Sequence, residues 1–79
     1  MSISNEDVAI INRVLRYRAI KHPELMEFSD ILEQIPVDLG FIDGDFPFRM
    51  YKYWEAKHPE IDVLDFNRII AQMLTELGF

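Results

Sequence analysis

The chain has 79 residues, of which 49% are apolar and 13% aromatic, and it contains no cysteine. This composition excludes a disordered chain, and the lack of thiols excludes disulfides and thiolate metal sites. The formal net charge is −6, and each of the segments 13–41 and 49–79 is basic first and acidic afterwards. We expect these basic and acidic faces to pair within the molecule, with a basic strip for an anionic partner as the alternative.

The first predicted helix begins near Ser4 and ends at Lys21 or His22. The Ser4 hydroxyl can accept a hydrogen bond from a free amide of the first turn, and Pro23 forces the residue before it out of the helical region. Apolar residues recur between these ends at helical spacing. They are Val8, Ile11, Leu15 and Ala19, with Ile10, Val14 and Tyr17 widening the stripe.

The second predicted helix has Ser29 as a candidate cap and Pro36 near its end. Proline lacks the amide that continues the helical ladder, so we expect this helix to be shorter than the fourth. Its apolar face comprises Phe28, Ile31, Leu32 and Ile35. Residues 37–46 then form a linker, in which Gly40 provides a left-handed stop.

The third predicted helix starts at Asp45, with Pro47 in its first turn, where a missing amide does no harm. Its apolar face comprises Met50, Tyr51, Tyr53 and Trp54, and it ends before Pro59. We expect Asp62 to open the fourth helix, with Asp65 as its capping-box partner. The apolar stripe of the fourth helix comprises Leu64, Ile69, Ile70, Met73, Leu74 and Leu77.

Residues 13–41 and 49–79 are two copies of one unit, with a two-residue insertion in the second copy. At least eleven aligned positions are identical, whereas unrelated segments would share about two. Such self-similarity indicates one supersecondary unit used twice. Each copy is a helical hairpin that cannot cover its own apolar face. The predicted fold is therefore all-α, a single domain over residues 1–79 in which two tandem hairpins pack about a pseudo-two-fold axis into one small four-helix bundle.

One difference between the copies suggests a specific contact, because Arg18 corresponds to Trp54. Equivalent residues approach one another near a pseudo-two-fold axis, so we expect the Arg18 guanidinium to stack on the Trp54 ring. The alternative is that Arg18 extends to water along its aliphatic stem.

The sequence contains no pattern for catalysis. The His-Pro-Glu corners at 22–24 and 58–60 do not have the spacing of a zinc motif, and Asp43-Gly44-Asp45 lacks the further ligands of a calcium loop. In each corner we expect the histidine to cap helix carbonyls while the proline forces the turn. A glycine-rich phosphate loop and a nucleophilic serine in a strand–turn–helix setting are also missing. We therefore expect no enzyme activity, no metal site and no cofactor.

Aromatic residues crowd the linker and the third helix beyond what a thin core can hold, and patches of this kind are typical of interface hot spots. The sequence therefore favours a small non-catalytic protein–protein interaction module with an accessory, regulatory or inhibitory role. The expected partner is another protein, and a homodimer is a further candidate. The predicted partner-binding residues are Phe48, Tyr51, Trp54 and Phe79.

The alternative function is a nucleic-acid-binding regulator that neutralises phosphates with the basic halves of the first and third helices. This strip would comprise Arg13, Arg16, Lys21, Arg49 and Lys52. Net negative charge disfavours it, and mimicry of nucleic acid by the acidic side chains is a weaker alternative still. The N-terminal residues lack the layout of a signal peptide, and no segment is apolar and long enough to cross a bilayer, so we expect a cytoplasmic protein without a membrane partner.

Overall fold

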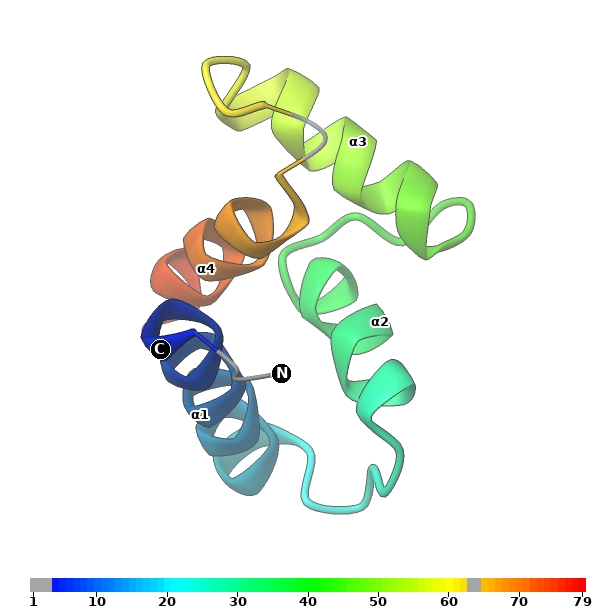
Figure 1. Cartoon of the computed structure of the whole chain (residues 1–79). Coiled ribbons are helices and arrows are strands. Elements are labelled where there is room, and N and C mark those ends of the chain that lie inside the picture. Colours follow the sequence, from blue (N-terminus) through cyan, green and yellow to red (C-terminus); the bar gives the residue numbers. More distant parts are fainter. Residues whose placement is uncertain (1–3, 63–64) are drawn as a thin grey trace.

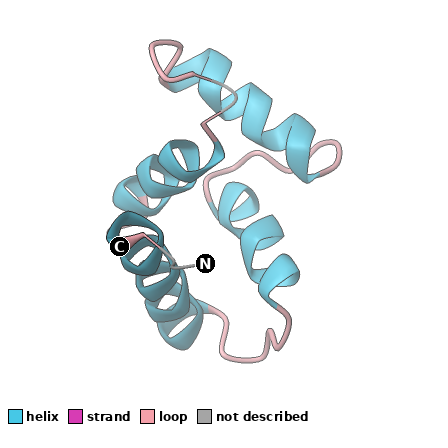
Figure 2. Ribbon diagram, in the orientation of Figure 1, coloured by secondary structure: helices cyan, strands magenta, loops and turns pink. Residues whose placement is uncertain are grey.

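The computed structural model of the chain describes residues 4–62 and 65–79. These residues form four helices, α1 (Asn5–Lys21), α2 (Phe28–Asp38), α3 (Phe46–Lys57) and α4 (Phe66–Glu76). Figure 2 shows that loops and turns connect them and that the described residues contain no strand. The predicted all-α fold is confirmed.

Three of the predicted helix ends are confirmed by their capping hydrogen bonds. Ser4 accepts a hydrogen bond from the Asp7 amide (3.1 Å), and Asp45 accepts one from the Phe48 amide (3.1 Å). α1 ends at Lys21, where the His22 amide donates to the carbonyl of Arg18 (2.9 Å). The side-chain caps satisfy amides that have no partner within the first turn, which explains why short polar residues stand at these positions.

Three other predictions about helix ends are wrong. Ser29 lies inside α2, whose N-cap is Glu27, and Asp65 rather than Asp62 caps α4 by accepting from the Arg68 amide (3.2 Å). α2 and α4 are both 11 residues long. Pro36 removes only its own amide, so α2 continues for two more residues to Asp38. Leu64 lies outside the described residues.

The helices pack mainly between the two copies. α1 lies on α4, α3 lies on α2, and α2 and α4 contact each other in the centre (Figure 1). α1 and α2, which belong to one copy, contact each other less, and α3 and α4 less still. Because the duplication relates α1 to α3 and α2 to α4, this arrangement has the expected pseudo-two-fold symmetry. Within each hairpin the two helices make few contacts with each other. The helices of the other copy therefore provide most of their packing contacts.

The two copies contribute equivalent residues to the core on either side of the pseudo-two-fold axis. Val14, Tyr17, Ile31 and Ile35 of the first copy correspond to Met50, Tyr53, Ile69 and Met73 of the second, and all eight are at most 5% exposed. Ile70 and Leu74 of α4 complete the buried cluster. Removing such side chains from water contributes about 1.5–3 kcal/mol each, so the two helices in the centre carry much of the stability.

The last residue of each copy packs on the tyrosine of the other copy. The Phe79 ring lies edge-on to Tyr17 at 5.7 Å between centroids, and the Phe41 ring lies edge-on to Tyr53 at 5.8 Å. Arg13 also holds Phe79 in place beside Tyr17. Its guanidinium donates to the Phe79 carbonyl oxygen (2.9 Å) and to the Thr75 hydroxyl (2.7 Å). The matched Tyr and Phe positions of the repeat therefore connect the two copies.

The predicted stack of Arg18 on Trp54 is wrong. The Arg18 guanidinium donates to the carbonyl oxygens of Pro23 (3.2 Å) and Leu25, which lie in the corner that follows its own helix. These carbonyls lie in a loop, where regular backbone hydrogen bonds are missing. A side-chain donor such as Arg18 therefore satisfies them. The Trp54 ring lies instead beside Tyr51, at 5.5 Å between ring centroids.

Candidate functional site

Two of the predicted partner-binding residues lie together on α3. Phe48 and Tyr51 are each 44% exposed, and both line a shallow hollow of about 410 Å³. The ammonium group of Lys52 lies 5.2 Å from the centroid of the Phe48 ring. The same ring packs against Gly44 in the linker and leaves no room for a side chain there. Phe48 is therefore supported by the linker and still presents its ring to solvent.

The other two predicted anchors are half-buried. Trp54 packs against the core beside Tyr51, and Phe79 packs against Tyr17 at the far end of α4. The structure thus brings Phe48, Tyr51 and Trp54 onto one helix and places Phe79 elsewhere. The role of these residues in binding a partner stays a prediction.

A second apolar surface lies between the N-terminal halves of α1, α2 and α4, and sequence analysis missed it. It is a hollow of about 370 Å³, which we call the α1–α2 groove. Its polar lining is Asp7 and Asn67, whose side chains are hydrogen-bonded to each other (2.7 Å). Its apolar lining comprises Ile10, Ile11, Val14, Phe28, Leu32, Phe66 and Ile70.

The side chains at the mouth of the groove are large and exposed. Ile11 is 37% exposed, Phe28 44% and Phe66 42%, and Val8 and Leu15 extend the apolar surface along α1. The sequence did contain a signal for this surface. Apolar residues occupy more than half the circumference of α1, but only the Val14 and Tyr17 side of the helix is buried in the core. The wider part of the stripe faces outward.

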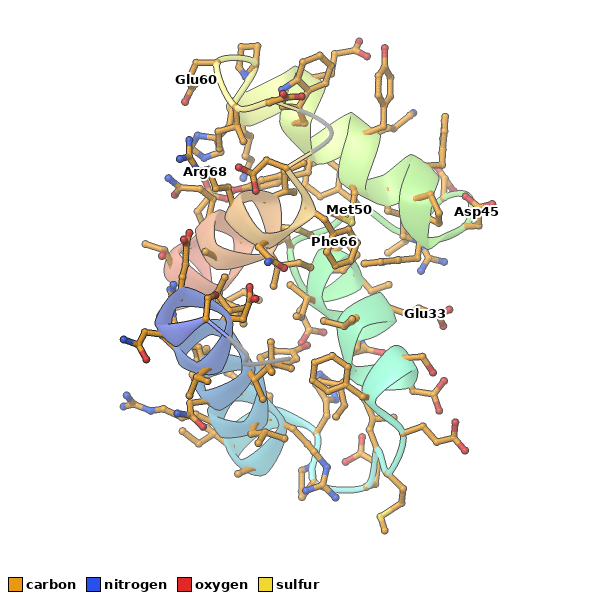
Figure 3. All side chains as sticks on the ribbon, viewed as in Figure 1. Glu33, Asp45, Met50, Glu60, Phe66 and Arg68 are labelled. Carbon is orange, nitrogen blue, oxygen red and sulfur yellow. The ribbon has the colours of Figure 1, made fainter. Side chains whose placement is uncertain are left out.

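The groove has a counterpart related to it by the duplication. A smaller hollow of about 290 Å³ is lined by Pro47, Met50, Tyr51 and Phe66, which correspond to Ile11, Val14, Leu15 and Phe28. Figure 3 shows Phe66 beside Met50 at this point. Phe66 lines both hollows, and Tyr51 also lines the hollow beside Phe48. One apolar row therefore runs across the molecule, comprising Ile11, Phe28, Phe66, Tyr51 and Phe48.

The predicted basic strip does not form one free surface. Arg13 binds the carbonyl of Phe79, and Arg49 is half-buried with its Nε atom enclosed and unpaired. Arg16 and Lys21 are exposed on α1, and Lys52 covers the Phe48 ring. Its binding of nucleic acid stays a prediction.

The expected pairing of basic with acidic faces is only partly realised. Lys57 lies 3.7 Å from Glu76, and Arg68 lies 3.1 Å from Asp65 within the first turn of α4. Arg13 and Arg18 instead donate to carbonyl and hydroxyl oxygens. Most of the basic groups in α1 therefore serve the backbone or face solvent.

Each His-Pro-Glu corner forms a cluster of hydrogen bonds. In the first copy, the His22 ring contacts Glu24 through Nδ1 (3.3 Å) and Asp38 through Nε2 (2.6 Å), and the Tyr17 hydroxyl donates to the same Asp38 carboxylate. In the second copy, the His58 ring contacts Glu60 (3.2 Å) and Glu76 (2.9 Å). The expected carbonyl cap is made by the histidine backbone amide, whereas the ring joins the corner to the following helix.

These clusters connect each corner to the helix that follows it. Both nitrogens of each ring contact carboxylates. Within residues 4–62 and 65–79, no group of three His, Asp or Glu side chains is arranged to hold a metal ion. No helix in the described part of the chain is long and apolar enough to cross a membrane.

The pKa values of the cluster follow from these contacts. Partial burial acts to lower the pKa of His22, but its hydrogen bonds to Asp38 and Glu24 outweigh burial and raise the pKa above the ordinary value. The hydrogen bond to Glu76 is the main reason why the pKa of His58 is raised. Burial acts to raise the pKa of Asp38, but hydrogen bonds from Tyr17, Gln34 and His22 outweigh it and lower the pKa.

We expect the protein to be most stable between about pH 4 and pH 6.5. The raised histidine pKa values contribute stability that is complete below about 6.5 and is lost as the pH rises through the folded values. The lowered pKa of Asp38 contributes stability above about 3.9 that is lost as the pH falls. Each histidine should contribute about 1 kcal/mol, after allowance for its partial exposure.

Urea unfolding of the wild type and of the H22Q/H58Q double variant at pH 6 and pH 8 checks this expectation. The wild type should lose stability between these two values, and the variant should lose much less. An equal loss in both proteins would contradict the assignment to the histidines.

No protein-family model, no curated protein and no solved structure matches this chain.

Proposed function

We propose that the protein is a small non-catalytic interaction module that binds another protein through the apolar row. The observation that carries this proposal is the continuity of five exposed large side chains across three adjoining hollows. Contiguous apolar patches of this kind on small proteins usually serve binding, because exposure of apolar surface to water is unfavourable. The row includes Phe48 and Tyr51, which the sequence had already selected.

The composition of the row also supports a protein partner. It combines three phenylalanines and a tyrosine with an aliphatic residue, and aromatic side chains supply much of the binding energy at protein interfaces. Lys52 lies over the Phe48 ring and provides a polar rim at that end. This mixture of an aromatic centre and a charged edge is typical of a protein interface.

The proposal is tested by crosslinking a tagged protein in its host and comparing two matched double variants. The I11Q/Y51Q variant changes the row, whereas I20Q/I42Q changes two exposed side chains outside it, which are 58% and 66% exposed. We expect the row variant to lose the crosslinked partner by about tenfold or more, because two hot-spot contacts are removed. The control variant should retain it, and thermal melting should show both variants folded.

Retention of the same partner by I11Q/Y51Q would contradict the proposal.

The nucleic-acid alternative has its own test, because Arg16 and Lys21 are both exposed on α1. It requires DNA or RNA binding that weakens steeply between about 50 and 200 mM salt and is reduced in R16Q/K21Q. We expect neither.

A further inference from the structure

We propose that the α1–α2 groove receives a basic amphipathic helix of the partner protein, with its apolar side chains in the groove and lysine or arginine side chains along its edges. This inference rests on the proposed function and specifies the chemistry of the partner.

The shape of the groove suits a helix. Its two walls are α1, with Ile11 and Val14, and α2, with Phe28 and Leu32, and α4 closes one end with Phe66. Val8, Ile11 and Leu15 follow one another along α1 at intervals of three and four residues, so they form a ridge beside the groove. A helix presents its apolar residues at the same intervals, which makes an amphipathic helix the natural complement.

The described residues of the chain leave this position open. α1 and α2 belong to one copy of the repeat but make fewer contacts with each other than α1 makes with α4. Figure 1 shows the two helices set apart from each other and joined at one end by the corner that follows α1. A helix laid between them would supply the contacts that the open hairpin lacks and would cover Ile11 and Phe28 at the same time.

The charge around the groove indicates which charge the partner helix should carry. Three helices begin beside it, and each N-terminus contributes about half of a positive charge. The acidic side chains at the start of α1 carry whole charges: Asp7 lines the groove, and Glu6 precedes it in the first turn of the same helix. Arg68, the basic residue of α4, is paired with Asp65. The negative charges therefore outweigh the helix dipoles and favour a basic ligand.

The same charges disfavour a second copy of this chain in the groove. Its net charge is −6, and an isologous contact would bring the acidic first turns of two copies toward each other. A partner with lysine or arginine beside its apolar face meets no such repulsion.

Two labelled synthetic peptides of about 15 residues test the inference, a length at which an isolated helix is marginally stable. They share one pattern of leucines at helical spacing, but the remaining positions are lysine in one and glutamate in the other. We expect the lysine peptide to bind, and the glutamate peptide to bind at least about tenfold more weakly, when measured by fluorescence anisotropy. The substitution Asp7→Asn should weaken binding of the lysine peptide several-fold.

Matched variants of α1 show whether binding occurs in the groove. Ile11→Gln should weaken the lysine peptide by about tenfold, because a buried aliphatic contact is lost, whereas Ile20→Gln should leave it unchanged. Phe28→Gln is a second groove variant from a different helix. Equal binding of both peptides, or equal binding by wild type and both groove variants, would overturn the inference.

The result is separable from that of the crosslinking experiment. If the partner is lost in I11Q/Y51Q but the lysine peptide does not bind, the inference fails and the proposed function stands. If sedimentation shows a dimer of the wild type that Ile11→Gln dissociates, the groove belongs to a second copy and the inference fails.

Discussion

Replacing Ile31 or Ile69 with alanine is expected to lower the free energy of unfolding by about 3 kcal/mol in each case. The two side chains are 2% and 1% exposed and occupy equivalent positions on α2 and α4, the helices in the centre of the fold. Each truncation removes three carbon atoms from a packed site and leaves a cavity that its neighbours fill only in part. The near equality of the two losses follows from the duplication.

Such a loss is large for a chain of 79 residues, whose total stability should be about 4–12 kcal/mol. Urea denaturation followed by circular dichroism measures it, with Ile20→Ala as a control on an exposed site. The control should change stability by less than about 0.5 kcal/mol. Strongly unequal losses in the two isoleucine variants would mean that the copies do not play matched roles in the core.

Much of this fold follows from short-range signals in the sequence. Ser4 and Asp45 cap helices because their side chains reach free amides, and Pro23 and Pro59 end helices because they exclude the preceding residue from the helical region. The repeat then predicts the pairing of copies, since a single hairpin leaves its apolar face uncovered. These features depend on residues close in sequence or on symmetry, so no long-range information was needed.

The arrangement of exposed and buried apolar residues could not be predicted in the same way. Val8, Ile11 and Leu15 have the periodicity of a core stripe, and so do Val14 and Tyr17. Only the packing of α1 on α4 decides which set is buried, and it selects Val14 and Tyr17. The α1–α2 groove therefore became visible only with the tertiary structure.

The hydrogen-bond partners of the basic residues could not be predicted, because several of them are backbone carbonyls that no sequence pattern reveals. Arg18 binds carbonyls of the corner that follows α1, and Arg13 binds the carbonyl of Phe79, 66 residues away. A guanidinium group has several donors and satisfies carbonyls as readily as carboxylates. Charge segregation along the chain therefore overstated the number of ion pairs.

The matched tyrosines of the two copies provide the last and most discriminating prediction. Tyr17→Phe should destabilise the protein by about 2 kcal/mol, whereas Tyr53→Phe should have almost no effect or a slightly stabilising one. Both residues are fully buried, and burial together with a nearby carboxylate raises the pKa of each hydroxyl. The Tyr17 hydroxyl donates to Asp38, whereas the Tyr53 hydroxyl is enclosed near Glu76 without a hydrogen bond of good geometry.

The difference arises because removal of a hydroxyl acts oppositely in the two settings. Tyr17→Phe removes a hydrogen bond to a charged acceptor that is partly buried, and Asp38 keeps only its contacts with His22 and Gln34. Tyr53→Phe removes a buried polar group that gains little from its surroundings, so the cost of burying that group disappears. Urea unfolding at pH 7 compares the two variants directly. Equal losses would mean that the Tyr53 hydroxyl does find an acceptor in solution, for which the neighbouring Glu76 carboxylate is the candidate.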